Sequence, residues 1–346
     1  MEKALFGKHG RDTPPNWRPS TASNGGELAD IDRLLVQRRV LRRLTGRASE
    51  PVALGHFELR RGLGRGGMGV VYEAIDRRTG RLVALKGIPE LDAHNVSRIK
   101  REFRHAVDLC HPNLVSVFEL FECDGNWFFS MELVRGRRFD EYVRDAEGAS
   151  VRDALRQLVA GVSHVHGKGK LHGDLKSSNV LVTGSGRVVI LDLGLAREAT
   201  PSTLSRPAEN ACAGTVGYLS PEQLQGQEPK SASDWYAVGV MLFKAMFGRT
   251  PAAARAERSA DLQKLTLAVP PPLARICAGL LCEGPAYRFD AREVLRELDG
   301  WSGERQETTR HLPTPTEPGR STQRALAPLE SHRPETPSTA PRARAT

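Results

Sequence analysis

The sequence predicts an α+β fold with two lobes, a small antiparallel sheet with one main helix followed by a larger helical lobe. Short strand-like runs occupy most of residues 57–133, and one helical pattern, at about residues 93–109, interrupts them. Helical patterns at residues 138–146 and 151–166 come next. Runs of strands followed by runs of helices are typical of an α+β protein, whereas a parallel sheet needs strands and helices to alternate.

Composition separates a folded domain from its flanking segments. The two ends of the chain are rich in Pro, Ser, Thr, Gly and charge, and such segments bury too little apolar surface to fold. Before the domain, Leu and Ile recur at helical spacing among arginines, which predicts a basic amphipathic helix that packs on the domain or docks a partner. We expect a disordered segment at residues 1–26, the basic helix at 27–50, a domain at 56–300 with lobes at about 56–133 and 137–300, and a disordered tail at 301–346.

Charge and cysteine content argue against several classes of function. Lys and Arg outnumber Asp and Glu by 50 to 41, but the excess arginines gather at residues 33–47 and in the tail, so we expect no nucleic acid partner. The five cysteines form no Cys-x-x-Cys pair and have no histidine at zinc spacing, which favours reduced thiols in a cytoplasmic protein. We find no signal-peptide core and no apolar run of about 18 residues, and we expect no membrane span.

Glycines join two strand-like segments at the start of the domain. Gly-x-Gly-x-x-Gly fits from Gly62 or from Gly64, and we prefer the second because it leaves Val71 two residues after the last glycine, positioned to cover an adenine. Glycine lets backbone amides approach phosphate oxygens. A strand follows the motif, whereas a Rossmann turn opens a helix and a Walker loop needs Gly-Lys-Ser or Gly-Lys-Thr. The predicted nucleotide-binding residues here are Leu63, Gly64, Arg65, Gly66, Gly67, Met68, Gly69, Val70 and Val71.

The next strand, residues 82–86, ends in a lysine that we interpret as a phosphate clamp. A lone strand lysine usually faces water, but Lys86 follows the glycine hairpin and precedes a helix whose mid-helix carboxylate is Glu102. We expect an ion pair between Lys86 and Glu102; a surface pair of Glu102 with Arg98 is the alternative. Residues 132–134 are interpreted as a hinge whose backbone could bind adenine. The remaining predicted nucleotide-binding residues are Ala84, Met131, Glu132 and Val134.

Four polar residues follow or flank apolar runs in the second lobe. Asp174, Lys176 and Asn179 lie in one short loop, and Asp192 ends the next apolar run. Strand ends can hold such side chains at one point. Phosphoryl transfer from a magnesium nucleotide uses this set: Asp174 would accept the hydroxyl proton, Lys176 would neutralise charge, and Asn179 and Asp192 would ligate Mg²⁺. Two solvated turns are the alternative, which four residues at this spacing disfavour.

With these motifs, residues 56–299 resemble a protein kinase catalytic domain of the bacterial, eukaryotic-like Ser/Thr type, and the roles given above follow the signature residues of that family. Residues 214–222 resemble the end of an activation segment, and Asp234 opens a stretch similar to the buried helix whose Asp braces the catalytic loop. The resemblance implies ATP and Mg²⁺ as cofactors, protein substrates with Ser or Thr acceptors, and an ion pair of Glu222 with Arg288. The catalytic residues it implies are Lys86, Glu102, Asp174 and Lys176, with Asn179 and Asp192 on the metal.

Two other functions stay open at this point. Small-molecule kinases of the aminoglycoside and choline type are similar in the His-Gly-Asp loop, although residues 195–222 favour a protein substrate, and Lys176 and Thr215 are features associated with Ser/Thr acceptors. A catalytically silent pseudokinase that signals by docking is the second alternative. The tail could carry autophosphorylation sites or a docking motif, and a plain linker fits it equally well.

Three positions depart from the family pattern. Gly173 stands where many kinases have an Arg that pairs with a phosphorylated activation loop. Leu193 replaces the usual Phe after Asp192, which is a mild apolar change. Ala106, one helical turn after Glu102, is smaller than the residue usually stacked there, so this helix could be held loosely.

Because Gly173 removes the charged partner of a loop phosphate, activity should depend little on phosphorylation of the activation segment. A variant with alanine at Thr200, Ser202, Thr203 and Ser205 should keep its turnover in a phosphate-transfer assay. Loss of turnover in this fourfold variant would disprove the prediction.

Overall fold

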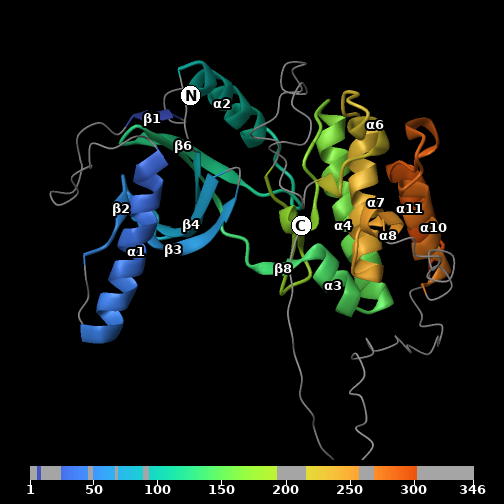
Figure 1. The fold of residues 1–346 in the computed structure, drawn as a ribbon, viewed down its shortest axis with the longest axis horizontal. Helices are drawn as coiled ribbons and strands as arrows, with labels where there is room; N and C mark the ends of the chain where they lie inside the picture. Colours follow the sequence, from blue (N-terminus) through green and yellow to red (C-terminus); the bar gives the residue numbers. More distant parts are fainter. Residues whose placement is uncertain are drawn as a thin grey trace, which may run out of the picture. The chain divides into compact units, whose positions relative to one another are not determined.

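A seven-stranded sheet opens the described part of the chain, and a three-stranded sheet with a group of helices follows it (Figure 1). The computed structural model describes residues 6–8, 25–45, 50–66, 69–88, 93–192, 216–256 and 269–301. These residues belong to one unit, residues 1–308, and residues 309–346 lie outside the described part. None of the described helices combines the length and the apolar run that a bilayer span requires.

The large sheet is antiparallel, as predicted, except at one edge. Its order is β1-β6-β7-β5-β4-β3-β2, and the β1–β6 pair is parallel. Strand β1 lies within residues 1–26, the segment for which we predict disorder, and that segment assignment stays a prediction. The strands are β1 (Phe6–Lys8), β2 (Ala53–Leu54), β3 (Phe57–Gly66), β4 (Gly69–Asp76), β5 (Leu82–Ile88), β6 (Val117–Cys123) and β7 (Asn126–Glu132).

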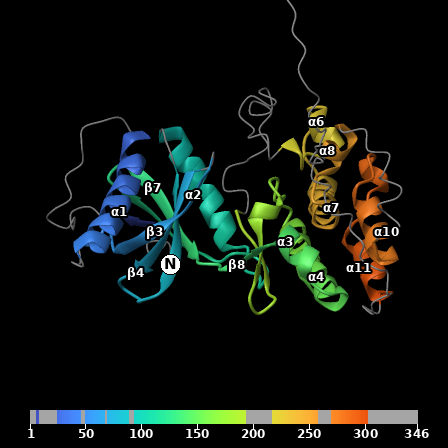
Figure 2. The ribbon, with the colours of Figure 1, turned by 60° about the horizontal axis from the view of Figure 1, so that its bottom comes forward.

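Alternate residues along the sheet face two different cores, since side chains of a strand point in turn to its two faces. Leu85 packs in a cluster with Ile31 of helix α1 (Gly25–Thr45). Ala84 packs in the other cluster, together with residues of helix α2 (Ala93–Val107), which is the predicted main helix of this lobe. The two helices therefore cover opposite faces of the sheet, as Figure 2 shows.

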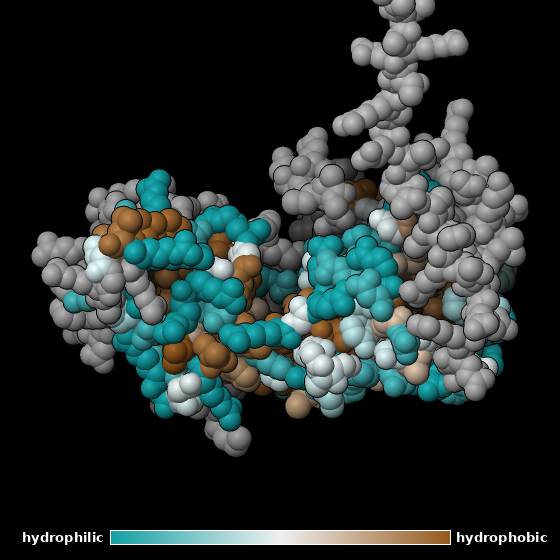
Figure 3. Space-filling view, turned by 90° about the horizontal axis from the view of Figure 1, so that it is seen from below, coloured by the Kyte–Doolittle hydropathy of each residue, from teal (hydrophilic) through white to brown (hydrophobic). Residues whose placement is uncertain are grey.

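Helix α1 buries only part of its apolar pattern. Ile31 is 4% exposed and Leu35 is partly buried against the sheet, but Leu41 and Leu44 are 51% and 78% exposed. The described helix spans Gly25–Thr45, and the predicted segment boundary near position 50 stays a prediction. Its leucines are spread too widely around the axis to reach one sheet together, so the single apolar face that we predicted is only partly used. Apolar and polar residues are mixed on the surface of the half that carries α1 (Figure 3).

Helix α7 forms the centre of the helical lobe. Every residue from Ser233 to Phe243 is buried, and Gly239 allows helix α10 to approach, because a Cβ at this position would lie 2.8 Å from Cβ of Leu280. The helices are α3 (Phe139–Asp145), α4 (Gly148–Gly167), α6 (Pro221–Leu224), α7 (Ser231–Phe247), α8 (Pro251–Ala256), α10 (Pro271–Leu280) and α11 (Ala291–Asp299), with short 3₁₀ turns η2 (Ser177–Asn179) and η3 (Pro285–Tyr287). The small antiparallel sheet has the order β10-β9-β8, with β8 at Gly136–Arg138, β9 at Val180–Thr183 and β10 at Val188–Ile190.

A buried ion pair joins the start of α6 to the turn before α11, as predicted for Glu222 and Arg288. Arg288 Nη1 and Nη2 donate to the two carboxylate oxygens of Glu222 at 2.7 and 3.0 Å. Ser233 Oγ adds a third hydrogen bond to Glu222 Oε1 at 2.9 Å, and Arg288 also donates to the carbonyl oxygens of Ala232 and Cys282. The nitrogen atoms Nε, Nη1 and Nη2 of this buried guanidinium thus each donate to an acceptor, as burial of a charge requires.

Opposing effects set the pKa of Glu222. Burial alone would raise this pKa, but the hydrogen bond from Arg288 and those from Ser233 and the backbone outweigh burial and lower the pKa to about 2. A carboxyl whose pKa is lower in the folded chain than in the unfolded chain stabilises the fold fully above its unfolded pKa. This contribution is lost as the pH falls from about 4.5 toward 2.

Glu222→Gln should lower the free energy of unfolding by about 3–5 kcal/mol at pH 7, because Arg288 keeps its buried charge and loses its anionic partner. The gap from wild type should shrink by on the order of 3 kcal/mol as the pH falls through the window below 4.5. Urea denaturation followed by tryptophan fluorescence at several pH values measures the gap. Glu141→Gln, at a half-exposed carboxylate, is the control with little effect at any pH. A gap that stays constant down to pH 3 would contradict the assignment.

Candidate active site

The loop after helix α4 is held by the buried carboxylate of Asp234. The backbone N–H groups of His172 and Gly173 donate to its two oxygens at 2.8 and 2.9 Å, and His166 Nε2 lies 2.9 Å from Oδ2. Burial alone would raise the pKa of Asp234, but the hydrogen bond from His166 and the interactions with His172 and Gly173 hold that pKa below its usual range. Gly173 has φ of 72°, a left-handed conformation that glycine adopts without strain.

Asp174 follows this turn, with its side chain fixed from two sides. Lys176 Nζ donates to Asp174 Oδ2 at 2.8 Å, and Asn179 Nδ2 donates to the same oxygen at 3.1 Å and to the Asp174 carbonyl at 2.9 Å. Asp174 and Asn179 are 8% and 5% exposed. The loop therefore brings together three of the four polar residues that the sequence singled out, with the carboxylate oriented before any substrate arrives.

Asp192 lies beside this loop because the preceding residue, Leu191, is hydrogen-bonded to the loop. The N–H of Leu191 donates to the Asn179 carbonyl at 2.7 Å, and His172 Nε2 lies 2.9 Å from the Leu191 carbonyl oxygen. Asp192 itself has φ of 52°, an uncommon backbone conformation for a residue with a side chain. Such conformations persist where the surroundings impose them and cluster at functional sites.

Lys86 bonds to Asp192 across the two lobes. Lys86 Nζ donates to Asp192 Oδ1 at 2.7 Å, although the two residues are 106 positions apart in the sequence. We had expected Glu102 as the partner of Lys86. The side chain of Glu102 lies outside the described residues, so that pair stays a prediction, and the described ion pair of Lys86 is with a carboxylate that sequence spacing alone could not select.

The glycine motif forms a hairpin of two strands with no helix after it, as predicted. Gly64 pairs with Val71, and Gly66 pairs with Gly69, while Gly67 and Met68 lie outside the described residues. Leu63 and Arg65 are exposed on β3. Strand alternation separates the two valines that we grouped. Val70 is buried in the core with α1, whereas Val71 packs with the cluster that contains Ala84 and Met131. The side chain of Val70 therefore faces away from the predicted nucleotide, and only its backbone remains a candidate.

The predicted hinge follows β7. Ala84 and Met131 are opposite residues of β5 and β7 and are 4% and 7% exposed, and their contact with a nucleotide stays a prediction. The N–H of Glu132 donates to the Ser116 carbonyl at 2.8 Å. Leu133 and Val134 are partly buried and pack on the same core. The chain then leaves the large sheet for β8, so these residues do connect the two lobes.

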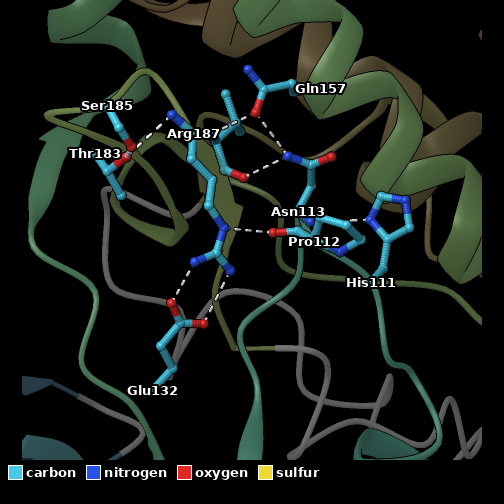
Figure 4. Close-up of polar contacts among 9 residues, drawn as sticks. His111, Pro112, Asn113, Glu132, Gln157, Thr183, Ser185 and Arg187 are labelled. Atoms are coloured by element: carbon cyan, nitrogen blue, oxygen red, sulfur yellow. Dashed lines mark hydrogen bonds and ion pairs between the residues drawn. The ribbon is translucent and has the colours of Figure 1, made fainter.

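Sequence reasoning missed an arginine that fixes this hinge. Arg187 Nη1 and Nη2 donate to the two carboxylate oxygens of Glu132 at 2.5 and 3.1 Å, and Arg187 Nε donates to the Pro112 carbonyl at 2.7 Å (Figure 4). Beside it, Asn113 Nδ2 donates to the Val188 carbonyl and to Gln157 Oε1. The hinge, the loop after α2 and the β9–β10 hairpin are thus joined by polar contacts.

A weak signal for this network was present in the sequence. Arg187 directly precedes the apolar run that ends at Asp192, and Gln157 is a polar residue within a largely apolar helical pattern. Neither position differs in type from an ordinary surface residue, so only the tertiary contacts reveal their role.

Two oxygen donors of the site suit a divalent metal. Asn179 uses its amide nitrogen to bond to Asp174, which leaves Oδ1 as the acceptor, and the carboxylate of Asp192 is about a quarter exposed. Within the described ranges, no three His, Cys, Asp or Glu side chains gather as a metal cage. Hard divalent cations at phosphate sites commonly take one or two protein oxygens and complete their shell with phosphate and water, so this donor set fits.

A comparison with known families identifies the family of the chain. Residues 57–297 match the family model described as protein kinase domain. The chain belongs to the protein kinase family. Its two-lobed fold and the resemblance that the loop motifs carried are thereby confirmed, and protein kinases act with ATP and a divalent metal.

Relatives of this chain include bacterial Ser/Thr kinases. It is 32% identical over 258 residues to the serine/threonine-protein kinase PrkC of Bacillus subtilis (strain 168). This alignment covers 70% of this chain and 39% of PrkC. It is 33% identical over 232 residues to the serine/threonine-protein kinase PknA of Mycobacterium tuberculosis, which covers 63% of this chain and 53% of PknA. The chain thus spans less than two thirds of the length of these curated relatives. The solved PknI kinase domain of Mycobacterium tuberculosis shares the fold, with a TM-score of 0.53 at 21% identity over 73% of this chain and 99% of that one.

Removing the partner of the hinge carboxylate should weaken nucleotide binding. Arg187→Met should raise KM for ATP by roughly tenfold with a smaller effect on kcat, because a lost charge-assisted pair of about 1.4 kcal/mol is equivalent to one decade. Glu132→Gln should have a similar effect, and the double variant little more. Steady-state kinetics with varied ATP measure this, and Arg144→Met, at an exposed arginine, is the control. An unchanged KM in both single variants would contradict the role of the pair.

Proposed function

We propose that this chain is an ATP-dependent protein kinase that phosphorylates Ser and Thr hydroxyls of protein substrates. The observation that carries the proposal is the meeting of Lys86 with Asp192, beside the loop of Asp174 and Asn179. Residues from both lobes contribute to this one point, as transfer of a phosphoryl group between a nucleotide and a hydroxyl requires.

Each side chain has a role that follows from its contacts. Asp174 accepts the proton of the attacking hydroxyl, since Lys176 and Asn179 orient its carboxylate. Lys176 neutralises charge near the transferred phosphoryl group, and Lys86 binds the nucleotide phosphates. The glycine hairpin covers the phosphates with its backbone, and the hinge at residues 132–134 binds adenine. Glu102 is kept as the second partner of Lys86 in the nucleotide-bound protein.

Mg²⁺ is the metal that we assign to Asn179 and Asp192. When bound, it neutralises phosphate charge and orients the phosphoryl group for transfer. Both residues supply hard oxygen ligands, which Mg²⁺ prefers over nitrogen or sulfur.

Ser and Thr acceptors are supported by Lys176, two positions after Asp174, and by the names of the bacterial relatives. Autophosphorylation within the Thr-rich tail belongs to the same proposal, and the tail itself lies outside the described residues. Thr215 and the four activation-segment hydroxyls also lie outside them. The family match to protein kinases, rather than to small-molecule kinases, is the reason to prefer protein substrates over small alcohols.

Asp174→Asn should lower kcat by roughly a hundredfold to ten-thousandfold, the usual contribution of a general base, with little change in nucleotide affinity. Transfer of radiolabelled phosphate from ATP to a casein-like protein, to the chain itself and to small alcohols measures the activity and its acceptor class. Asp153→Asn, at a carboxylate with 65% side-chain exposure, is the matched control and should behave as wild type.

Transfer to small alcohols but not to protein would overturn the substrate assignment. Equal turnover by wild type and Asp174→Asn would overturn the role of Asp174 as base, and unchanged signalling output from that variant would favour a docking pseudokinase.

A further inference from the structure

Helix α1 lies outside the residues that match the family model, yet it contacts the glycine hairpin directly. Arg65, on β3, donates a hydrogen bond from Nη2 to the carboxylate of Asp32 on α1, and the two side chains form an ion pair. The hydroxyl of Tyr72, on β4, also hydrogen-bonds to Asp32. A single carboxylate on the helix is thus bonded to both strands of the hairpin.

The residues next to this contact are buried in the core between α1 and the sheet. Tyr72 is fully buried, and Ile31, the neighbour of Asp32, is 4% exposed in the same cluster. Burial and the nearby Asp32 both raise the pKa of Tyr72, so its hydroxyl keeps the proton that it donates. Further along the helix, Arg38 donates to the Leu59 carbonyl at 3.5 Å and lies 3.9 Å from the Glu58 carboxylate. The helix is therefore attached to β3 at two separated points.

The register of the sheet connects this contact with the nucleotide site. Tyr72 is opposite Gly62 on β3 and opposite Leu85 on β5. Its neighbour Val71 is opposite Lys86. A displacement of Tyr72 would therefore move the glycine-containing strand β3 and Val71, the residue predicted to cover adenine. Arg65, the other partner of Asp32, lies within the glycine motif itself.

We propose that α1 is a positioning element for the nucleotide-binding hairpin, with Asp32 holding Arg65 and Tyr72 so that the glycine backbone stays where it covers the phosphates. This proposal rests on the proposed nucleotide-binding function. A glycine-rich hairpin has high conformational freedom, and restricting it before the ligand arrives reduces the ordering cost of binding.

Coupling between the docking of α1 and nucleotide binding is reciprocal. If α1 favours the binding-competent hairpin, a bound nucleotide must favour the docked helix by the same factor. Hydrogen exchange of the backbone amides of residues 25–45 should then slow when nucleotide is added to the wild-type protein.

The test uses the full chain with Asp32→Ala, Tyr72→Phe and the double variant, and with Gln37→Ala, at an exposed position of the same helix, as control. Hydrogen exchange of residues 57–76 in the nucleotide-free protein reports hairpin order without reference to activity. Calorimetry with ADP and Mg²⁺ gives the Kd, and steady-state kinetics with varied ATP separate KM from kcat.

Asp32→Ala should speed exchange in the hairpin and raise the Kd for ADP by roughly three- to tenfold, with kcat within about twofold of wild type. Tyr72→Phe should shift the Kd in the same direction, and the double variant should be less than additive because both changes remove one contact.

Hairpin exchange and Kd in Asp32→Ala equal to those of Gln37→Ala would overturn the proposal. Faster exchange spread equally over β6 and β7 would also overturn it, since that result indicates a general loss of stability. Absence of phosphate transfer by the wild type would reject the kinase activity instead, while the exchange data would still decide the role of α1.

Discussion

The buried carboxylate of Asp234 is the constraint on which the active-site loop depends. An ionised group that is 4% exposed must be satisfied by donors, and two of its donors are consecutive backbone amides, those of His172 and Gly173. Two neighbouring amides can point at one carboxylate only where the chain turns sharply, and the left-handed conformation of Gly173 provides the turn. The departure from the Arg common in the family is thus compatible with the geometry, because glycine adopts this conformation more easily than arginine does. Asp174 emerges from the turn in a fixed orientation.

Charged groups of the site are paired within the protein itself. Lys86 bonds to Asp192, and Lys176 bonds to Asp174, at 2.7 and 2.8 Å. Each pair holds a long lysine side chain in a defined place beside a carboxylate, which reduces the reorganisation needed when substrate arrives. The pairing also joins the two lobes at a defined point, since Lys86 belongs to the large sheet and Asp192 follows the small one.

Local patterns allowed much of this to be predicted, and tertiary contacts decided the rest. Strand alternation and glycine placement predicted the hairpin, and the spacing of Asp174 and Asn179 predicted the loop, because these features depend on residues close in the sequence. The contact of Lys86 with Asp192 joins residues 106 positions apart, and the contact of Arg187 with the hinge joins residues 55 apart. No short-range pattern encodes such pairs. The same reason accounts for the short strand β1, which exists through pairing with β6 rather than through its own composition.

The two faces of the large sheet contact different parts of the protein. One face, with Ala84 and Lys86, belongs to the proposed nucleotide site, and the other, with Leu85 and Tyr72, belongs to the core under α1. Because alternate residues of one strand serve both faces, a helix that packs on the outer face acts on the inner one through the backbone alone, without a side chain in the site. Among the described side chains of α1, Ile31 is buried in that core while Leu41 and Leu44 are exposed, and Asp32 and Arg38 make polar contacts with β3. The contacts of Asp32 and Arg38 with β3 therefore bear on where the glycine hairpin lies, which is the role that we propose for α1.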